Sequence, residues 1–445
     1  MTRFEELRER YPVFRYERFD IERSSSRLTA KFEFSAPPDI SFAPEVHFEG
    51  PPDGEFSESV IFHLGLIECF SYWKATASPA IQVLAGTLNE DQIAWWHDLL
   101  IHGMGEYFYR NDIDFTVPDL VRIVSNGAGS IRPPYTAALP GRSLLAVGGG
   151  RDSALAAALL RDSQHPFTCM MLNPSSAARK IAAMSAKANP VVVQRAICPG
   201  LLELNRRGYL NGHTPFSAYL AFLGAACLLI YGYSNVIVAN ERSSEEGNVR
   251  FHESEINHQY SKSLRFEERF DEYLKTYLAS GARYFSLVRP LYELQIGKAF
   301  SRFPEFFELF KSCNRNRSDS WCGQCPKCVS VFLTMCPFVP NDDLSAVFGR
   351  DLLQREETIP ILRELAGFEV KPFECVATAN EIVAALALAI GKVNASGARL
   401  PVVLEFAARH VPGSKDTRLA STILATYGPH RLPPEFESLL RRVLQ

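Results

Sequence analysis

A short apolar strand, three consecutive glycines and a helix start follow one another within residues 143–153, and this unit constrains the fold more than any other feature. The strand is expected at 143–147 and the helix at 152–160. At such a junction backbone N–H groups point outward, the helix dipole is positive, and glycine lets a phosphate approach the backbone closely. The unit therefore predicts an anion-binding loop. Its residues are Gly148, Gly149, Gly150, Arg151, Asp152 and Ser153.

Two common phosphate-binding fingerprints do not fit this loop. A Walker A motif needs Gly-x4-Gly-Lys-[Ser/Thr], and the dinucleotide motif Gly-x-Gly-x-x-Gly fails because Ser153 stands at its sixth position. The loop resembles the PP-loop, Ser-Gly-Gly-x-Asp-Ser, of ATP pyrophosphatases, which implies splitting of ATP into AMP and pyrophosphate. The resemblance places Ser153 and the loop amides against the pyrophosphate, and Arg151 could add a phosphate contact. The alternative is a tight turn without ligand, in which Asp152 and Ser153 only cap the helix.

Composition excludes several classes of protein. The chain has 445 residues, is 47% hydrophobic and 22% charged, and carries a net charge of −3. These values predict a globular protein of two or three domains and argue against a nucleic-acid or anionic-membrane surface. The charged N-terminus lacks a signal-peptide core, and the longest apolar run, near 218–231, is too short to span a bilayer. With ten cysteines, this favours a cytoplasmic location.

Strand-like and helical runs alternate from residue 141, which predicts an α/β fold with a parallel, Rossmann-like sheet. The segments before it contain an alternating hairpin pattern at 13–23 and 27–34, and helical patterns near 60–76 and 90–109. The sequence thus divides into four predicted regions. These are an α+β domain (1–140) that could bind the substrate, a PP-loop ATP-binding domain (141–300), a four-cysteine zinc segment (301–340) and a helical region (341–445).

Four cysteines form the second motif, Cys313-x8-Cys322-x2-Cys325-x2-Cys328. Four thiolates at this spacing suit a closed tetrahedral Zn²⁺ site, which is typical of a structural metal. An iron–sulfur cluster would also use four cysteines. The arrangement resembles the zinc site of the 7-cyano-7-deazaguanine synthase family. Five cysteines in apolar contexts are interpreted as core residues rather than nucleophiles: Cys69, Cys169, Cys198, Cys227 and Cys375.

A dense group of polar residues follows the expected strand at 236–239. Ligands of open α/β sheets bind beyond the carboxyl ends of the strands, so these residues are expected near the ATP site, although a solvated loop is the simpler alternative. Asn240 is assigned to the nucleotide, and Glu241 could bind Mg²⁺. The candidate catalytic residues are Glu241, Glu246, His258 and Lys262.

These segments together resemble the UDP-N-acetylmuramoyl-L-alanyl-L-glutamate epimerases, the MurL family. The family pattern differs at Arg151, where it has lysine, and at residues 243–245. The resemblance rests on residues 62–67, 71–76, 148–153, 211–218, 240–241, 246–248, 257–262, 284–287, 312–314 and 321–328.

The resemblance implies ATP-dependent epimerisation of the terminal L-glutamate of UDP-N-acetylmuramoyl-L-Ala-L-Glu, a cytoplasmic peptidoglycan precursor. Adenylation of the α-carboxylate would remove its charge and make the Cα proton acidic, and Mg²⁺ would offset the pyrophosphate charge. The rival hypotheses are a PP-loop ligase or amidating enzyme of the deazaguanine-synthase type, a tRNA-modifying PP-loop protein, and a non-catalytic nucleotide-binding module. The sequence does not indicate the oligomeric state.

Overall fold

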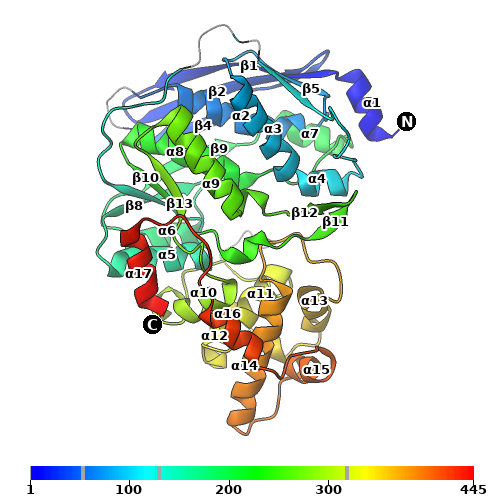
Figure 1. The fold of residues 1–445 in the computed structure, drawn as a ribbon, viewed down its shortest axis with the longest axis vertical. Coiled ribbons are helices and arrows are strands. Elements are labelled where there is room, and N and C mark those ends of the chain that lie inside the picture. Colours follow the sequence, from blue (N-terminus) through cyan, green and yellow to red (C-terminus); the bar gives the residue numbers. More distant parts are fainter. Residues whose placement is uncertain (1, 52–55, 126, 128–131, 316–319, 445) are drawn as a thin grey trace.

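The computed structural model of the protein describes residues 2–51, 56–125, 127, 132–315 and 320–444. Within these ranges eleven strands form one mixed, mostly parallel sheet in the order β13-β10-β7-β8-β9-β4-β2-β1-β5-β6, with β3 paired to β2 (Figure 1). This confirms the α/β class. Residues 316–319, inside the predicted zinc segment, lie outside the described part. No described helix has both the length and the apolar character needed to cross a bilayer.

The first part of the sheet is built by the N-terminal residues. β1 and β2 form the expected antiparallel hairpin, and β1 also pairs in parallel with β5 on its other side. The helical pattern near 90–109 forms two helices, α3 and α4, instead of one. α3 ends at Gly103, which packs so closely against Pro215 that a Cβ would lie 2.9 Å from it. The elements are α1 (Arg3–Arg10), β1 (Val13–Arg23), β2 (Arg27–Ala36), β3 (Ile40–Phe42), β4 (Glu45–Glu49), α2 (Ser59–Trp73), β5 (Ala80–Val83), α3 (Glu90–Gly103), α4 (Gly105–Arg110) and β6 (Arg122–Ser125).

The second part is the parallel, doubly wound unit that the alternating pattern predicts. Its strand order, β13-β10-β7-β8-β9, reverses direction of winding between β7 and β10. The elements are β7 (Ser143–Ala146), α5 (Arg151–Asp162), β8 (Phe167–Leu172), α6 (Ser176–Ser185), β9 (Val191–Ala196), α7 (Pro199–Arg206), α8 (Phe216–Tyr231), β10 (Asn235–Val238), β11 (Val249–Phe251), β12 (Ser254–Ile256), α9 (Leu264–Tyr273), β13 (Arg283–Ser286) and α10 (Glu293–Phe300).

Both faces of this parallel unit are covered and buried. Successive side chains along a strand point to opposite faces, so neighbouring residues pack into different cores. Leu144 and Val236 pack into the hydrophobic core that contains α2, α8 and α9. Leu145 and Ile237 pack into the second core, with α5, α6 and the C-terminal helices. The strands therefore read as continuous apolar runs, and only the loops at their ends are free to carry polar side chains.

β4 and β9 join the two parts through antiparallel pairing of Glu45–Phe48 with Ala196–Val193. The C-terminal helices pack beside the parallel unit, and α17 returns to it through Phe436, whose ring lies 4.9 Å from that of Phe285 (Figure 1). These helices are α11 (Pro326–Met335), α12 (Asn341–Phe348), α13 (Thr358–Leu365), α14 (Ala379–Ala395), α15 (Val402–His410), α16 (Arg418–Ala425) and α17 (Pro434–Leu444).

Candidate active site

The glycine loop connects β7 to α5 at the point where the sheet changes its winding direction. Gly149 has φ +95°, and a Cβ there would lie 2.9 Å from the backbone nitrogen of Ala178 and 3.0 Å from Ser175 Oγ. Only glycine combines this left-handed conformation with such a close approach. Gly150 is the N-cap of α5 without a capping side chain of its own. The Arg151 N–H donates to Ser312 Oγ, and the next N–H groups of the helix remain available for an anion.

A cavity of about 250 Å³ opens beside this loop. It lies at the carboxyl ends of β7, β8 and β10, where ligands of doubly wound sheets bind. Gly149 and Arg151 are not among its lining residues. Six residues assigned to the site from the sequence line the cavity: Gly148, Gly150, Asp152, Ser153, Asn240 and Lys262.

The Arg151 guanidinium points away from the cavity into a closed cluster of buried charges. It donates to Glu293 Oε2 at 2.6 Å, to Thr334 Oγ1 at 2.8 Å and to Asp152 Oδ1 at 3.1 Å. Lys327 Nζ donates to the other Glu293 oxygen at 3.0 Å. Burial alone would raise the pKa of Glu293, but the charges of Lys327 and Arg151 outweigh burial and lower this pKa to about 2. Arg151 therefore fixes the loop from behind instead of facing the cavity.

The four-cysteine segment is attached to the glycine loop by several hydrogen bonds. The Lys311 N–H donates to Gly149 O at 2.8 Å, and the Arg151 N–H donates to Ser312 Oγ at 3.1 Å. Lys327, which reaches Glu293, lies between two of the cysteines in sequence. The conformation of the loop thus depends on the residues that carry the four cysteines and on Lys311 and Ser312, which directly precede Cys313.

The structure brings the four predicted cysteines together, with all four sulfurs within 4.8 Å of one another. Cys328 Sγ lies 3.7 Å from Cys322 Sγ and 3.3 Å from Cys325 Sγ. Tetrahedral Zn²⁺ with Zn–S bonds of about 2.3 Å separates its sulfurs by about 3.8 Å. The arrangement is compatible with a closed zinc site.

Glu241 is fully buried at the end of β10, and neither carboxylate oxygen has a hydrogen-bond partner among the described residues. Burial raises the pKa of the neighbouring Asp152, and the Glu293 and Glu241 carboxylates act in the same direction. A buried carboxylate without partners is costly, so such a group calls for a cation. Asn240 precedes it, held by its N–H donating to Ser286 Oγ at 2.8 Å.

His258 lies in a second polar cluster with a residue that the sequence did not suggest. Its Nδ1 is 2.7 Å from Glu106 Oε2, an ion pair that bridges 152 positions in the chain. Burial lowers the pKa of His258, but Cys375 and Glu106 outweigh burial and raise it to about 9. The His213 ring lies 4.4 Å from the His258 ring, and burial lowers its pKa to about 4. Glu106, His213 and His258 also have potential metal-ligand atoms within 4.8 Å of one another.

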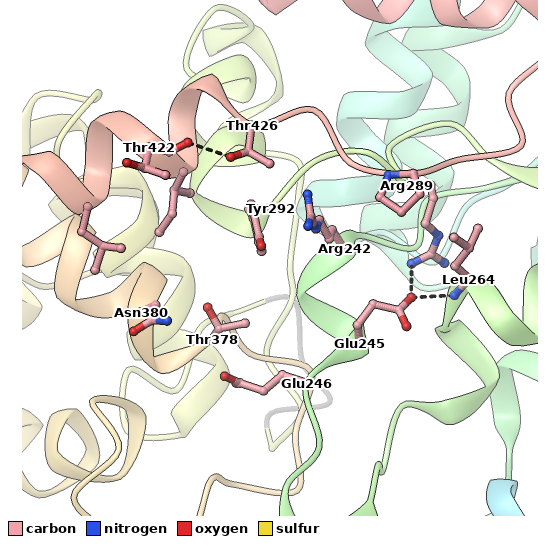
Figure 2. A pocket seen from close by; sticks show the side chains of 13 residues that line it. Arg242, Glu245, Glu246, Leu264, Arg289, Tyr292, Thr378, Asn380, Thr422 and Thr426 are labelled. Carbon is pink, nitrogen blue, oxygen red and sulfur yellow. Dashed lines mark hydrogen bonds and ion pairs between the residues drawn. The ribbon is translucent and has the colours of Figure 1, made fainter.

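A larger cavity of about 580 Å³ lies between the loop after β10 and the C-terminal helices (Figure 2). The Arg242 guanidinium lies 4.7 Å above the Tyr292 ring, and Figure 2 shows both side chains at its centre. Glu246, also on its wall, pairs with Lys371 Nζ at 2.7 Å. Its hydrogen-bonding wall residues from the C-terminal region are Thr378, Asn380, Thr422 and Thr426.

The predicted site residues thus fall into three places. Four of the loop residues (Gly148, Gly150, Asp152 and Ser153) share one cavity with Asn240 and Lys262, Glu246 lines the other, and His258 lies beside Glu106. Sequence reasoning missed Glu106, Glu293 and Cys375, because no local motif marks them. Cys375 is partly exposed and interacts with Lys262 and His258, which differs from its interpretation as a core residue. Cys69, Cys169 and Cys227 are buried, as expected, whereas Cys198 is partly exposed and also differs from that interpretation.

Comparison with known proteins identifies two matching family domains. The MurL N-terminal domain matches residues 5–287, and the MurL C-terminal domain matches residues 309–420. Together they include the cavity beside the glycine loop, the four cysteines and part of the wall of the larger cavity; Arg289 and Tyr292 lie between the two matched ranges, and the wall residues from Thr422 onward lie after them.

Full-length relatives agree with this match. The chain is 31% identical to the UDP-N-acetyl-alpha-D-muramoyl-L-alanyl-L-glutamate epimerase of Xanthomonas oryzae pv. oryzae, covering 95% of each chain. It is 33% identical to the epimerase of the same name from a Micromonospora species, over 85% of this chain and 84% of that one. For the epimerase of the same name from Salinispora tropica the identity is 35%, over 85% and 82% respectively.

Proposed function

Because the chain belongs to the MurL family, we propose that it epimerises the terminal L-glutamate of UDP-N-acetylmuramoyl-L-Ala-L-Glu to D-glutamate. In this proposal ATP adenylates the α-carboxylate of that glutamate, pyrophosphate leaves, and hydrolysis of the acyl-adenylate after epimerisation releases AMP. The protein is then an ATP-dependent isomerase that acts on a peptidoglycan precursor.

The observation that carries the ATP requirement is the unpaired carboxylate of Glu241 beside the glycine-loop cavity. An epimerase acting without a nucleotide needs neither an anion-binding helix start nor a buried carboxylate that calls for a cation. The loop supplies N–H groups from the start of α5 for phosphate oxygens, and the Ser153 hydroxyl and the Lys262 ammonium border the same cavity. These features together suit ATP with its metal ion.

The residues fit both metal ions of the proposal. Glu241, with Asp152 next to it, would hold Mg²⁺, which supplies positive charge against the departing pyrophosphate. The sulfurs of Cys313, Cys322, Cys325 and Cys328 would hold Zn²⁺, whose part is structural. Through Lys311, Ser312 and Lys327 this segment positions the glycine loop.

We assign the larger cavity to the UDP-sugar peptide. Arg242 on the Tyr292 ring offers a guanidinium to an anionic substrate, and the threonines and Asn380 offer hydrogen bonds to a sugar or peptide. Lys262 connects the two cavities, since its side chain lines the nucleotide cavity. Its carbonyl accepts from Arg289, on the wall of the larger one. The reacting carboxylate would meet ATP near Lys262.

The chemistry follows from charge. A free carboxylate resists loss of the Cα proton, because the resulting enolate would lie beside a second negative oxygen. Adenylation removes that charge, so a base can take the Cα proton, and a proton returns on the other face. In this scheme Lys262 stabilises negative charge that develops on the acyl oxygen.

Product analysis tests the proposal. The protein is incubated with ATP, Mg²⁺ and UDP-N-acetylmuramoyl-L-Ala-L-Glu in D₂O, and AMP, pyrophosphate and the chirality of glutamate are measured. We expect substrate-dependent AMP, D-glutamate and deuterium at Cα. AMP without D-glutamate or deuterium would instead favour an amidating or ligating enzyme, and D-glutamate without AMP would remove the ATP requirement.

A further inference from the structure

Cys375 lies on a segment of the C-terminal region that is fixed against the loop after β10. Lys371 Nζ, at the start of this segment, pairs with Glu246 Oε2 at 2.7 Å. The Pro372 carbonyl accepts from Asn248 Nδ2 at 2.8 Å. At its other end Thr378 caps α14 and lines the larger cavity. The position of Cys375 is therefore set by both halves of the molecule.

The thiol belongs to a cluster of polar groups at the edge of the nucleotide cavity. It interacts with the Lys262 ammonium, which lines the nucleotide cavity, and with the His258 ring. The Lys262 carbonyl accepts hydrogen bonds from Arg289 and from Ser244 Oγ, and Arg289 lies on the wall of the larger cavity. Lys262 thus connects the thiol with the nucleotide cavity through its ammonium and with the wall of the larger cavity through its carbonyl.

The surroundings of Cys375 favour the thiolate form. Burial alone would raise the pKa of the thiol, but Lys262 and His258 outweigh burial and lower this pKa from an ordinary value of 9 to about 7. Glu106 orients His258 through the 2.7 Å contact at Nδ1. A thiol beside a histidine that a carboxylate orients is an arrangement for moving protons.

We propose that Cys375 is a catalytic residue that transfers the proton at Cα of the terminal glutamate, with His258 and Glu106 as positioning residues behind it. The inference rests on the proposed epimerase function and names a proton-transfer group for it. Its basis is the place of the thiol, beside the Lys262 ammonium that lines the nucleotide cavity and beside the His258–Glu106 pair.

The proton transfer balances as follows. The Cα–H bond of the acyl-adenylate breaks, its proton forms an S–H bond with the Cys375 thiolate, and its electron pair forms the C=C bond of the enolate while the carbonyl π pair moves to oxygen. A solvent-derived proton then adds to Cα on the opposite face as that oxygen returns its pair. The thiol then releases its proton to solvent, and His258 stabilises the thiolate that is regenerated. Protonation of the L face by the thiol is the reverse step.

Variants of Cys375 test this role by separating adenylation from proton transfer. We expect Cys375→Ala to lower both D-glutamate formation and deuterium incorporation at Cα by about 100-fold or more. Substrate-dependent exchange of labelled pyrophosphate into ATP should persist, since the thiol takes no part in that step. The matched control is Cys198→Ala, which removes the other partly exposed thiol outside the four-cysteine cluster and should change neither readout.

Three results would overturn the inference or its premise. Epimerisation at the wild-type rate in Cys375→Ala excludes the thiol but leaves the epimerase function intact. Equal loss of pyrophosphate exchange and epimerisation in a folded Cys375→Ala assigns the thiol to nucleotide binding. Absence of exchange and epimerisation in the wild-type protein rejects the proposed function itself.

A second measurement on the wild-type protein does not depend on folding of a variant. Iodoacetamide at neutral pH should alkylate Cys375 faster than Cys198, as measured by peptide mass spectrometry, because only the thiolate reacts. Epimerase activity should fall in step with alkylation of Cys375. The rate of this alkylation should rise as the pH increases through about 7. Slower labelling of Cys375 than of Cys198, or full activity after its alkylation, would contradict the proposal. For His258, a shift of this pH profile in His258→Gln distinguishes positioning from a purely structural role.

Discussion

Glu293 and Glu241 lie near the same glycine loop and are both completely buried, but their surroundings are opposite. Both oxygens of Glu293 are paired, one with Arg151 and one with Lys327. Neither oxygen of Glu241 has a partner among the described residues. A paired buried carboxylate belongs to the scaffold, whereas one without a hydrogen-bond partner, on which Lys262 and Lys327 act only through space, is a candidate ligand for a cation. The difference separates the residues that hold the loop from those that we expect to bind Mg²⁺ and ATP.

The largest expected effect comes from removing metal from the four-cysteine segment. Lys327 of this segment pairs with Glu293, so the segment belongs to the scaffold that holds the loop. Binding of a structural zinc contributes about 10–16 kcal/mol of apparent free energy in small zinc domains, and that energy is coupled to folding. Chelation should therefore lower the melting temperature and weaken ATP binding, because Lys311, Ser312 and Lys327 hold the loop. Calorimetry and ATP titration before and after chelation measure both effects. Re-addition of Zn²⁺ should restore them, and unchanged ATP affinity in the metal-free protein would disconnect the segment from the loop.

Glu293→Ala breaks the closed cluster, because Lys327 loses its ion-pair partner and Arg151 keeps only Asp152. Loss of one partner from a buried pair costs about 3–5 kcal/mol, so the free energy of unfolding should fall by that amount. Urea denaturation measures it. The control is Glu305→Ala, which removes the surface partner of Arg161 and should cost less than about 1 kcal/mol. Equal stability of Glu293→Ala and wild type would contradict the scaffold assignment.

Glu241→Gln should have the opposite profile, with lost activity and retained stability. Replacing the carboxylate removes the charge that would hold Mg²⁺, and we expect AMP formation to fall by about 100- to 1,000-fold. The melting temperature should stay constant or rise, because an unpaired buried charge is removed. Steady-state assays and thermal denaturation measure the two quantities. A large loss of stability would show that Glu241 has a structural partner.

Acid titration gives the smallest expected effect and concerns Glu293 alone. Its pKa in the folded protein is about 2, below the ordinary value of 4.5. Its charge therefore stabilises the fold above pH 4.5, and this contribution is lost as the pH falls toward 2. Glu293→Gln should remove part of the acid-induced loss of stability between these values, as followed by denaturation at a series of pH values. An unchanged slope in the variant would reject the low pKa.

The sequence predicted the parallel unit and its loop because both depend on local patterns. Apolar runs bounded by turns indicate strands buried on two faces, and the glycines with Asp152 and Ser153 mark the helix start. The junction of β4 with β9 could not be predicted in the same way, because strands about 150 residues apart pair through tertiary packing. The predicted boundary near residue 140 therefore lies within one continuous sheet.

The orientation of side chains in the site was beyond the sequence for a similar reason. Arg151 faces Glu293, which lies 142 residues later, and Cys375 meets Lys262 across more than a hundred positions. The C-terminal region, for which the sequence indicated only helices, supplies Thr378, Asn380, Thr422 and Thr426 to the larger cavity. Long-range contacts of this kind leave no periodic or local signal, so only the folded chain shows them.

Binding of Mg²⁺ and ATP, measured by titration calorimetry on the wild-type protein, Glu241→Gln and Arg242→Ala, tests the central claim most directly. Glu241 is proposed to serve the nucleotide cavity and Arg242 the substrate cavity. The account predicts that wild type and Arg242→Ala bind ATP with Mg²⁺ at similar affinity and that Glu241→Gln loses this binding. Undiminished binding by Glu241→Gln, or loss of binding in Arg242→Ala alone, would contradict it.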